Sequence, residues 1–191
     1  DLTTEVATSV ITKLEEQAVD GTWNSGLGAS GSNWNTVSYG NGTWVAFATG
    51  GTLRSMYSST GEPGTWIAST TPNNNQDWYA STFGGNKFVA VGTGGQSIYS
   101  TDGVNWTLSN IQNEYWRGVT YGNGLFVAVG SSSGSPISTS SDGISWTART
   151  TPGDGSQSWY SVTYGLASDG VARYVAVAGN GQSAYSTDGI N

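Results

Sequence analysis

Residues 88–106 read FVAVGTGGQSIYSTDGVNW and set the pattern for most of this chain. An unbroken apolar run is followed by a Gly-rich turn, an alternating run, an Asp-Gly turn and Trp106. A short apolar run between turn signals is typical of a strand that is covered on both faces. Asp-Gly between two such runs favours a β-hairpin. With the residues just before it, the stretch predicts four strands, over 78–83, 87–91, 96–101 and 104–109.

The same pattern recurs four times. Each version opens with a tryptophan, and the four stand 44, 38 and 43 positions apart, at Trp34, Trp78, Trp116 and Trp159. A period near 40 residues with four strand-like runs is typical of propeller blades. The sequence therefore predicts an all-β fold, a β-propeller of four-stranded antiparallel blades. We expect the propeller to span residues 21–191, with blades near 33–71, 77–109, 115–150 and 158–191.

Residues 1–20 differ from the repeats, since they contain no glycine. Val6, Val10 and Leu14 follow a helical spacing of i, i+4 and i+8, which predicts a short N-terminal helix. Two interpretations stay open for this arm. It either packs on the surface of its own domain, or it docks on another virion or surface protein or another copy of the chain.

The last repeat is incomplete in the sequence. After Asp188 and Gly189 the pattern requires a Trp and an outer strand, whereas only Ile190 and Asn191 follow. Residues 20–24 read DGTWN and resemble the missing motif, so a strand from residues 20–28 is one way to complete the blade. The alternative is a longer polypeptide that continues into further blades.

The Asp-Gly turns also carry a family resemblance. Residues 100–106 and 140–146 share the pattern SxDGxxW, and residues 186–189 share its first half. These motifs resemble the Asp-boxes of sialidase-like and photosystem II assembly-factor-like propellers, although the usual box has one more residue before the Trp. The resemblance implies structural turns at Asp102, Gly103, Asp142, Gly143, Asp188 and Gly189.

A two-residue type I′ turn at these Asp-Gly pairs predicts a definite pairing of the strands. Counting outward from the turn sets Tyr99 opposite Trp106 and Thr139 opposite Trp146. The wording of the repeats, YGNGxFVAVG followed by YSTDGxxW, further resembles repeats of bacteriophage virion and tail-associated proteins.

Composition excludes several classes of function. A formal net charge of −7 gives no electrostatic basis for binding nucleic acid or an anionic membrane surface. The chain contains neither Cys nor His, which removes the thiol nucleophile and the commonest metal ligand. No apolar run reaches the roughly 18–20 residues that a membrane helix needs. We expect no metal, no cofactor and no membrane insertion.

Most of the nine tryptophans recur at equivalent positions, so we expect them to pack in the core rather than to bind sugars. Recognition is expected where the repeats disagree, in the connections that lead into each first strand. These connections share one face of the propeller with the links between the second and third strands. The candidate ligand-binding residues are Asp77, Tyr79, Tyr115, Arg117 and Tyr160.

Catalysis is not expected. The sialidase resemblance implies an arginine cluster with a Tyr–Glu nucleophile pair, but the four arginines, Arg54, Arg117, Arg149 and Arg173, occupy non-equivalent places in the repeats. No pair of carboxylates suited to general acid and base chemistry stands out. The absence of an enzyme site favours a structural or recognition module.

The favoured hypothesis is a bacteriophage virion protein, in the tail or associated with the capsid, that uses its propeller for assembly or for binding the host surface. The alternatives are a secreted or cell-surface lectin-like propeller that binds glycans, and an assembly factor resembling the photosystem II type. The expected locations are therefore the virion, the extracellular space or the cell surface.

Overall fold

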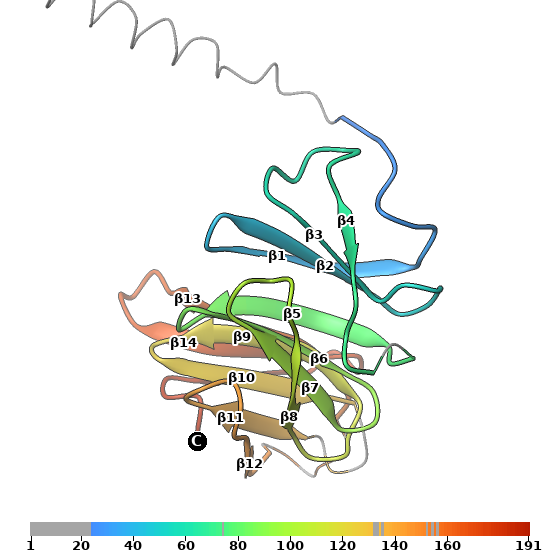
Figure 1. The fold of residues 1–191 in the computed structure, drawn as a ribbon. Helices are drawn as coiled ribbons and strands as arrows, with labels where there is room; N and C mark the ends of the chain where they lie inside the picture. Colours follow the sequence, from blue (N-terminus) through green and yellow to red (C-terminus); the bar gives the residue numbers. More distant parts are fainter. Residues whose placement is uncertain are drawn as a thin grey trace, which may run out of the picture.

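The computed structural model describes residues 24–191 except 74, 132, 133, 135, 152, 154 and 156. These residues form fifteen strands in four antiparallel sheets, each built in chain order (Figure 1). The fold is all-β and the sheets are propeller blades, as the repeat predicted. The expected helix over residues 1–20 lies outside the described residues.

Each sheet corresponds to one repeat. The bounds of the strands are as follows: β1 (Trp34–Gly40), β2 (Thr43–Ala48), β3 (Ser55–Ser58) and β4 (Ile67–Ser69) in blade 1; β5 (Trp78–Gly84), β6 (Lys87–Gly92), β7 (Gln96–Ser100) and β8 (Thr107–Asn110) in blade 2; β9 (Trp116–Gly122), β10 (Leu125–Gly130), β11 (Ile137–Ser140) and β12 (Thr147–Arg149) in blade 3; β13 (Trp159–Leu166), β14 (Ala172–Ala178) and β15 (Ser183–Ser186) in blade 4. Among the described residues, blade 4 has three strands where the others have four.

Tight hairpins join the first two strands of blades 1–3. In blade 1, Gly40 pairs with Thr43, and the two residues between them, Asn41 and Gly42, have φ of 47° and 73°. Positive φ at both central positions defines a type I′ turn and favours Asn and Gly there. The NG and GN dipeptides of the repeat therefore specify these inner turns.

The Asp-Gly turns differ from the prediction. Tyr99 pairs with Thr107 and Thr139 with Thr147, so the predicted pairings with Trp106 and Trp146 are wrong by one residue. Side chains explain the shift, because Ser100 Oγ and Asp102 Oδ1 accept the backbone N–H groups of residues 102–105. A two-residue turn would leave no room for these bonds, and the wider loop frees Trp106 from the sheet.

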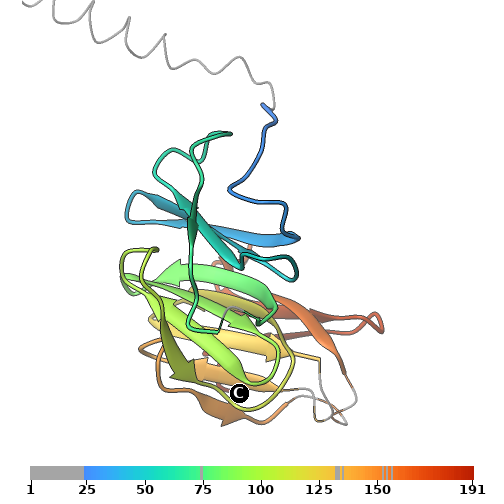
Figure 2. The same ribbon diagram turned by 45° about the vertical axis from the view of Figure 1, so that its right-hand side comes forward.

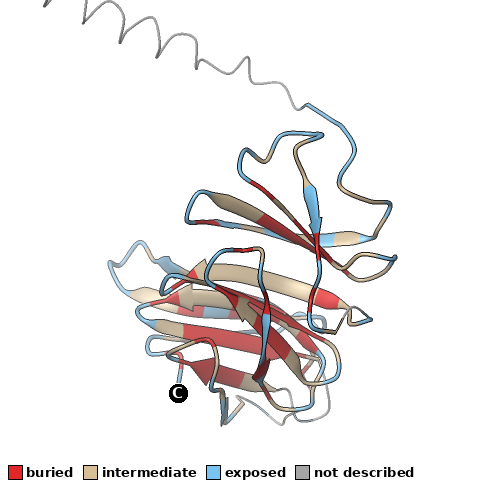
Figure 3. Cartoon of the chain, in the orientation of Figure 1, coloured by how far each residue is buried: buried red, intermediate tan, exposed pale blue. Residues whose placement is uncertain are grey.

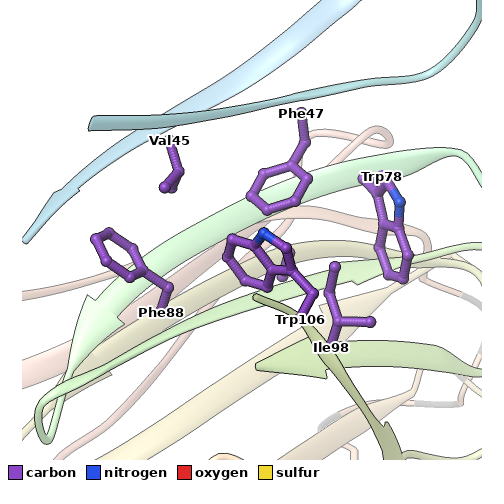
Figure 4. Close-up of a cluster of buried hydrophobic side chains, with 7 residues drawn as sticks. Val45, Phe47, Trp78, Phe88, Ile98 and Trp106 are labelled. Atoms are coloured by element: carbon purple, nitrogen blue, oxygen red, sulfur yellow. The ribbon is translucent and has the colours of Figure 1, made fainter. Parts of the chain in front are cut away.

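The core lies between blades rather than within one. Phe47 of β2 meets the freed indole of Trp106 edge-on, with ring centroids 4.8 Å apart, and Phe88 packs on the same indole (Figure 4). The leading tryptophans Trp78, Trp116 and Trp159 are at most 1% exposed. They pack in three such clusters, one at each junction between consecutive blades, as the sequence predicted for them.

In blades 1–3, a glycine at the end of the first strand admits an aromatic ring from the next blade. A Cβ on Gly40 would overlap the ring of Phe83, and one on Gly84 would overlap Tyr121. Gly122 receives Tyr164 in the same way. Only glycine lets the ring approach the backbone this closely, so this position fixes the spacing of the blades.

In the described part of the chain, the blades follow one another without closing into a ring. Packing joins β1 to β5, β5 to β9 and β9 to β13, and among the described strands no comparable packing joins β13 to β1. Figures 1 and 2 show blades 1 and 4 at the two ends of this series. Residues 24–28, the described part of the segment expected as one way to complete blade 4, lie against Met56 and Pro63 of blade 1.

Candidate functional site

Every blade carries a β-bulge directly after its leading tryptophan. In blade 2, Trp78 pairs with Gly92 and Ala80 with Val91, so Tyr79 is an extra residue without a partner in the ladder. The equivalent extra residues in the other blades are Asn35, Arg117 and Tyr160. A bulge bends its strand and redirects the side chain. The four bulges place four unlike side chains at one position of the propeller.

Three of these side chains meet. The guanidinium carbon of Arg117 lies 4.3 Å from the ring centroid of Tyr79 and 5.8 Å from that of Tyr160. Arg117 Nε donates a hydrogen bond to Ser131 Oγ at 3.1 Å, which fixes the guanidinium between the rings. Asn35 joins the group by donating to the backbone carbonyl of Tyr79 at 2.7 Å. We call Tyr79, Arg117 and Tyr160 the aromatic–arginine cluster.

The cluster carries the positive charge of Arg117. Among the described residues, no carboxylate lies within ion-pair distance of Arg117, although the chain as a whole has a net charge of −7. Tyr160 is 50% exposed, so the cluster opens to solvent. An arginine between two rings is held in place while its outer N–H groups stay available as donors.

The two other predicted site residues lie outside the cluster. Asp77 pairs with Arg54 of blade 1 at 3.3 Å, and this ion pair joins blades 1 and 2. Tyr115 is 56% exposed, and its backbone carbonyl accepts a hydrogen bond from the N–H of Ser131. Ser131 also holds Arg117, so Tyr115 borders the cluster while Asp77 has a structural ion pair.

Sequence reasoning missed the bulges and the role of Ser131. No local pattern marks a bulge within a single repeat. The available signal was the comparison of repeats, in which one position carries Asn, Tyr, Arg and Tyr while its neighbours stay similar. Ser131 directly follows β10, in the connection that shares a face with those leading into the first strands.

The Asp-Gly turns form a second set of polar groups, and their bonds are internal. Ser100 Oγ donates to Asp102 Oδ1 at 2.8 Å, and Asn105 Nδ2 donates to Oδ2 at 2.8 Å. Partial burial opposes ionisation of Asp102, but the N–H groups of Asn105 and Val104 and these side chains together lower its pKa. The turns at Asp142 and Asp188 repeat the pattern, and the pKa of each is also lowered.

The remaining arginines are separated from the cluster. Arg149 Nε donates to Thr139 Oγ1 on the neighbouring strand, and Arg173 pairs with Asp169 at 2.6 Å. The described residues hold no group of three or more His, Cys, Asp and Glu side chains arranged for a metal ion. Within the same part of the chain, no helix has the length and hydrophobicity of a membrane span.

The fold and the cluster define this chain as a β-propeller module. No protein-family model matches the sequence, and no curated protein matches it either. The solved structures that share the fold include the following three. The computationally designed Ika4 protein aligns with a TM-score of 0.62 at 12% identity, over 87% of this chain and 98% of its own.

The second is YCF48 bound to D1 peptide, with a TM-score of 0.57 at 20% identity over 86% of this chain and 52% of its own. The third is virginiamycin B lyase from Staphylococcus aureus, with a TM-score of 0.52 at 12% identity over 84% and 72%. This chain thus spans about half the length of YCF48. At these identities the likeness shows the propeller fold alone.

Proposed function

We propose that this chain is a non-enzymatic recognition module that binds a carboxylate-bearing ligand through the aromatic–arginine cluster. The observation that carries the proposal is the convergence of Tyr79, Arg117 and Tyr160 from three blades, each at a bulge. Equivalent positions that face a packed core would carry similar residues. These differ, and they gather around one cation without a carboxylate partner among the described residues.

The chemistry of the cluster favours a planar anion beside an apolar face. A guanidinium offers parallel N–H donors that match the two oxygens of a carboxylate. The tyrosine rings supply flat apolar surface and hydroxyl groups, which suits a ligand with both kinds of surface. Recognition of this kind needs a rigid scaffold, and first strands held by neighbouring blades provide one.

We place this module in a bacteriophage virion, where it binds the host surface or another virion protein. The support for this setting is the resemblance of the repeat wording, YGNGxFVAVG and YSTDGxxW, to phage virion and tail repeats. Copurification of the chain with virions, followed by mass spectrometry of the particle, tests the setting. Its absence from purified particles would contradict it.

The ligand class is tested by titrating the chain with a sialylated oligosaccharide, its matching asialo form and an acidic peptide. Replacing Arg117 by Gln removes the cation and is expected to weaken binding of the carboxylate ligand by about tenfold to hundredfold. The matched control is Arg149→Gln, which removes an arginine held on a neighbouring strand of blade 3. Equal affinity for the sialylated and asialo forms, or no effect of Arg117→Gln, would refute the carboxylate site.

A lectin-like function is the second candidate, because Tyr160 and Tyr115 expose half or more of their side chains and sugars stack on such rings. In that case a neutral glycan binds, and Tyr160→Ala abolishes binding while Arg117→Gln does not. The assembly-factor hypothesis is supported by the similarity of this fold to that of YCF48, but no particular residue of the site supports it. An acidic peptide that binds in preference to every glycan would favour it.

A further inference from the structure

The two end blades have complementary free faces. Val175 and Val177 of β14 are 38% and 46% exposed, whereas the equivalent residues in blades 1–3 are buried against the following blade. At the other end, Trp34, Met56 and Trp66 line a hollow of about 570 Å³ on the face of blade 1 that no other described blade covers. Within the described part of the chain, each end lacks the kind of neighbour that the other end provides.

We propose that two copies of this chain associate head to tail, with blade 1 of one copy packing on blade 4 of the other. The contact would repeat the junction that already joins blades 1 and 2, 2 and 3, and 3 and 4. Such a contact joins two different surfaces, the free face of blade 1 and the free face of blade 4. Both faces of every copy are therefore buried when the copies close into a ring.

One glycine identifies where the second copy docks. Gly40, Gly84 and Gly122 each receive an aromatic ring from the next blade, but a Cβ on Gly165 would meet nothing within 4 Å among the described residues. Tyr39 of blade 1 occupies the same repeat position as Phe83, but it has no glycine of a preceding described blade to pack on, and it is 54% exposed. Tyr39 of the second copy therefore fits over Gly165.

Residues 24–28 already lie where the outer strand of a preceding blade would end. The end of β8 meets the next blade through a bridge between Asn110 and Ser145. In blade 1, the N–H of Gly64 donates to the carbonyl of Leu27 at the corresponding place. Leu27 stands four residues after Trp23, as Asn110 stands four after Trp106. The segment is thus in register to serve as the missing outer strand.

Blade 4 has room for that strand. A cavity of about 500 Å³ lies between blades 3 and 4, lined by Val127, Tyr174 and Ile190 among others. Between blades 1 and 2, the corresponding space is filled by the indole of Trp106, which packs on Phe47 and Phe88. The described residues 24–28 of the second copy would lie beside β15 at this cavity, at the end of the missing outer strand.

Sedimentation velocity of the 191-residue chain over a wide concentration range tests the proposal. We expect a concentration-dependent increase from monomer to a closed assembly. Gly165→Ala is the sharpest variant, because its methyl group has open space in one copy and would overlap Tyr39 of the next. Overpacking of this kind is expected to raise the dissociation constant about tenfold or more while leaving the fold intact.

A matched pair of charges tests the apolar face. Val177 and Leu108 are 46% and 44% exposed, and only Val177 lies in the proposed interface. We expect Val177→Asp to abolish association and Leu108→Asp to leave it unchanged.

The results that overturn the proposal are equally definite. Sedimentation as a monomer at every concentration would show that the chain forms no such interface. This holds whether its own blades close into a ring or a longer polypeptide supplies further blades. Association that persists in both Gly165→Ala and Val177→Asp places the contact on another surface. In either case the aromatic–arginine cluster is unaffected, because its ligand binding is measured separately.

Discussion

Strands β6 and β14 have nearly the same sequence and different surroundings. Residues 88–91 read FVAV and residues 174–177 read YVAV. Val89 and Val91 are fully buried, but Val175 and Val177 are exposed by more than a third. Figure 3 shows many buried residues, in red, along the strands of blades 2 and 3. An apolar run in a repeat protein therefore indicates which strand of the repeat it forms. Whether that strand is buried depends on whether another blade packs against it.

The largest effect is expected at Trp106, which fills the junction between blades 1 and 2. Trp106→Ala removes an indole that packs on Phe47 and Phe88 and leaves a cavity. Loss of a buried tryptophan costs about 3–5 kcal/mol in the free energy of unfolding. Urea denaturation followed by circular dichroism measures this cost. A loss below about 1 kcal/mol would show that the junctions contribute little to stability.

The next contrast compares two glycines of one repeat position. Gly84→Ala forces the Tyr121 ring away from the backbone, so we expect a loss of about 1–3 kcal/mol or more. Gly165→Ala meets open space within one copy, and its effect on a monomer should stay within about 0.5 kcal/mol. Thermal melts of the monomer at low concentration compare the two. Equal losses would mean that the close approach of the ring is not what demands glycine.

A third contrast uses the same truncation in a covered and in a free strand. Val89→Ala removes two methyl groups from a packed junction and should cost about 2 kcal/mol. Val175→Ala removes them from a half-exposed face and should cost less than about 0.5 kcal/mol at concentrations where the chain is monomeric. If Val175→Ala became as costly as Val89→Ala at high concentration, the free face of blade 4 would be the one that the second copy covers.

The fold was predictable because the same pattern of strands, turns and leading tryptophans occurs four times in the sequence. The strand register at the Asp-Gly turns was not predictable from the sequence. The side chains of Ser100 and Asp102 accept hydrogen bonds from backbone N–H groups of the turn, and these bonds widen it beyond a two-residue type I′ hairpin. The type I′ turns lie at the NG and GN dipeptides instead.

The candidate site was predictable only in part. Comparison of the repeats pointed to Tyr79, Arg117 and Tyr160, and the structure brings these three together. It could not show the bulges, because an extra residue in one strand is defined by its partner strand. Nothing in the sequence indicated that Asp77 forms an ion pair with Arg54, because Arg54 belongs to a different blade.

The smallest effect concerns the Asp-Gly turn of blade 2. Asp102→Asn keeps the shape but weakens the bonds from the N–H groups of Val104 and Asn105, at a cost of about 1 kcal/mol at neutral pH. The pKa of Asp102 is below its ordinary value of about 3.9 when folded, so its contribution is complete above that pH. It is lost progressively as the pH falls from about 4–5 through the folded pKa, so the gap in stability between the two proteins should begin to narrow below about pH 4–5 and close only in stronger acid. Thermal melts from about pH 7 to about pH 2 measure this gap, and a gap that closes already near pH 5 would contradict the lowered pKa.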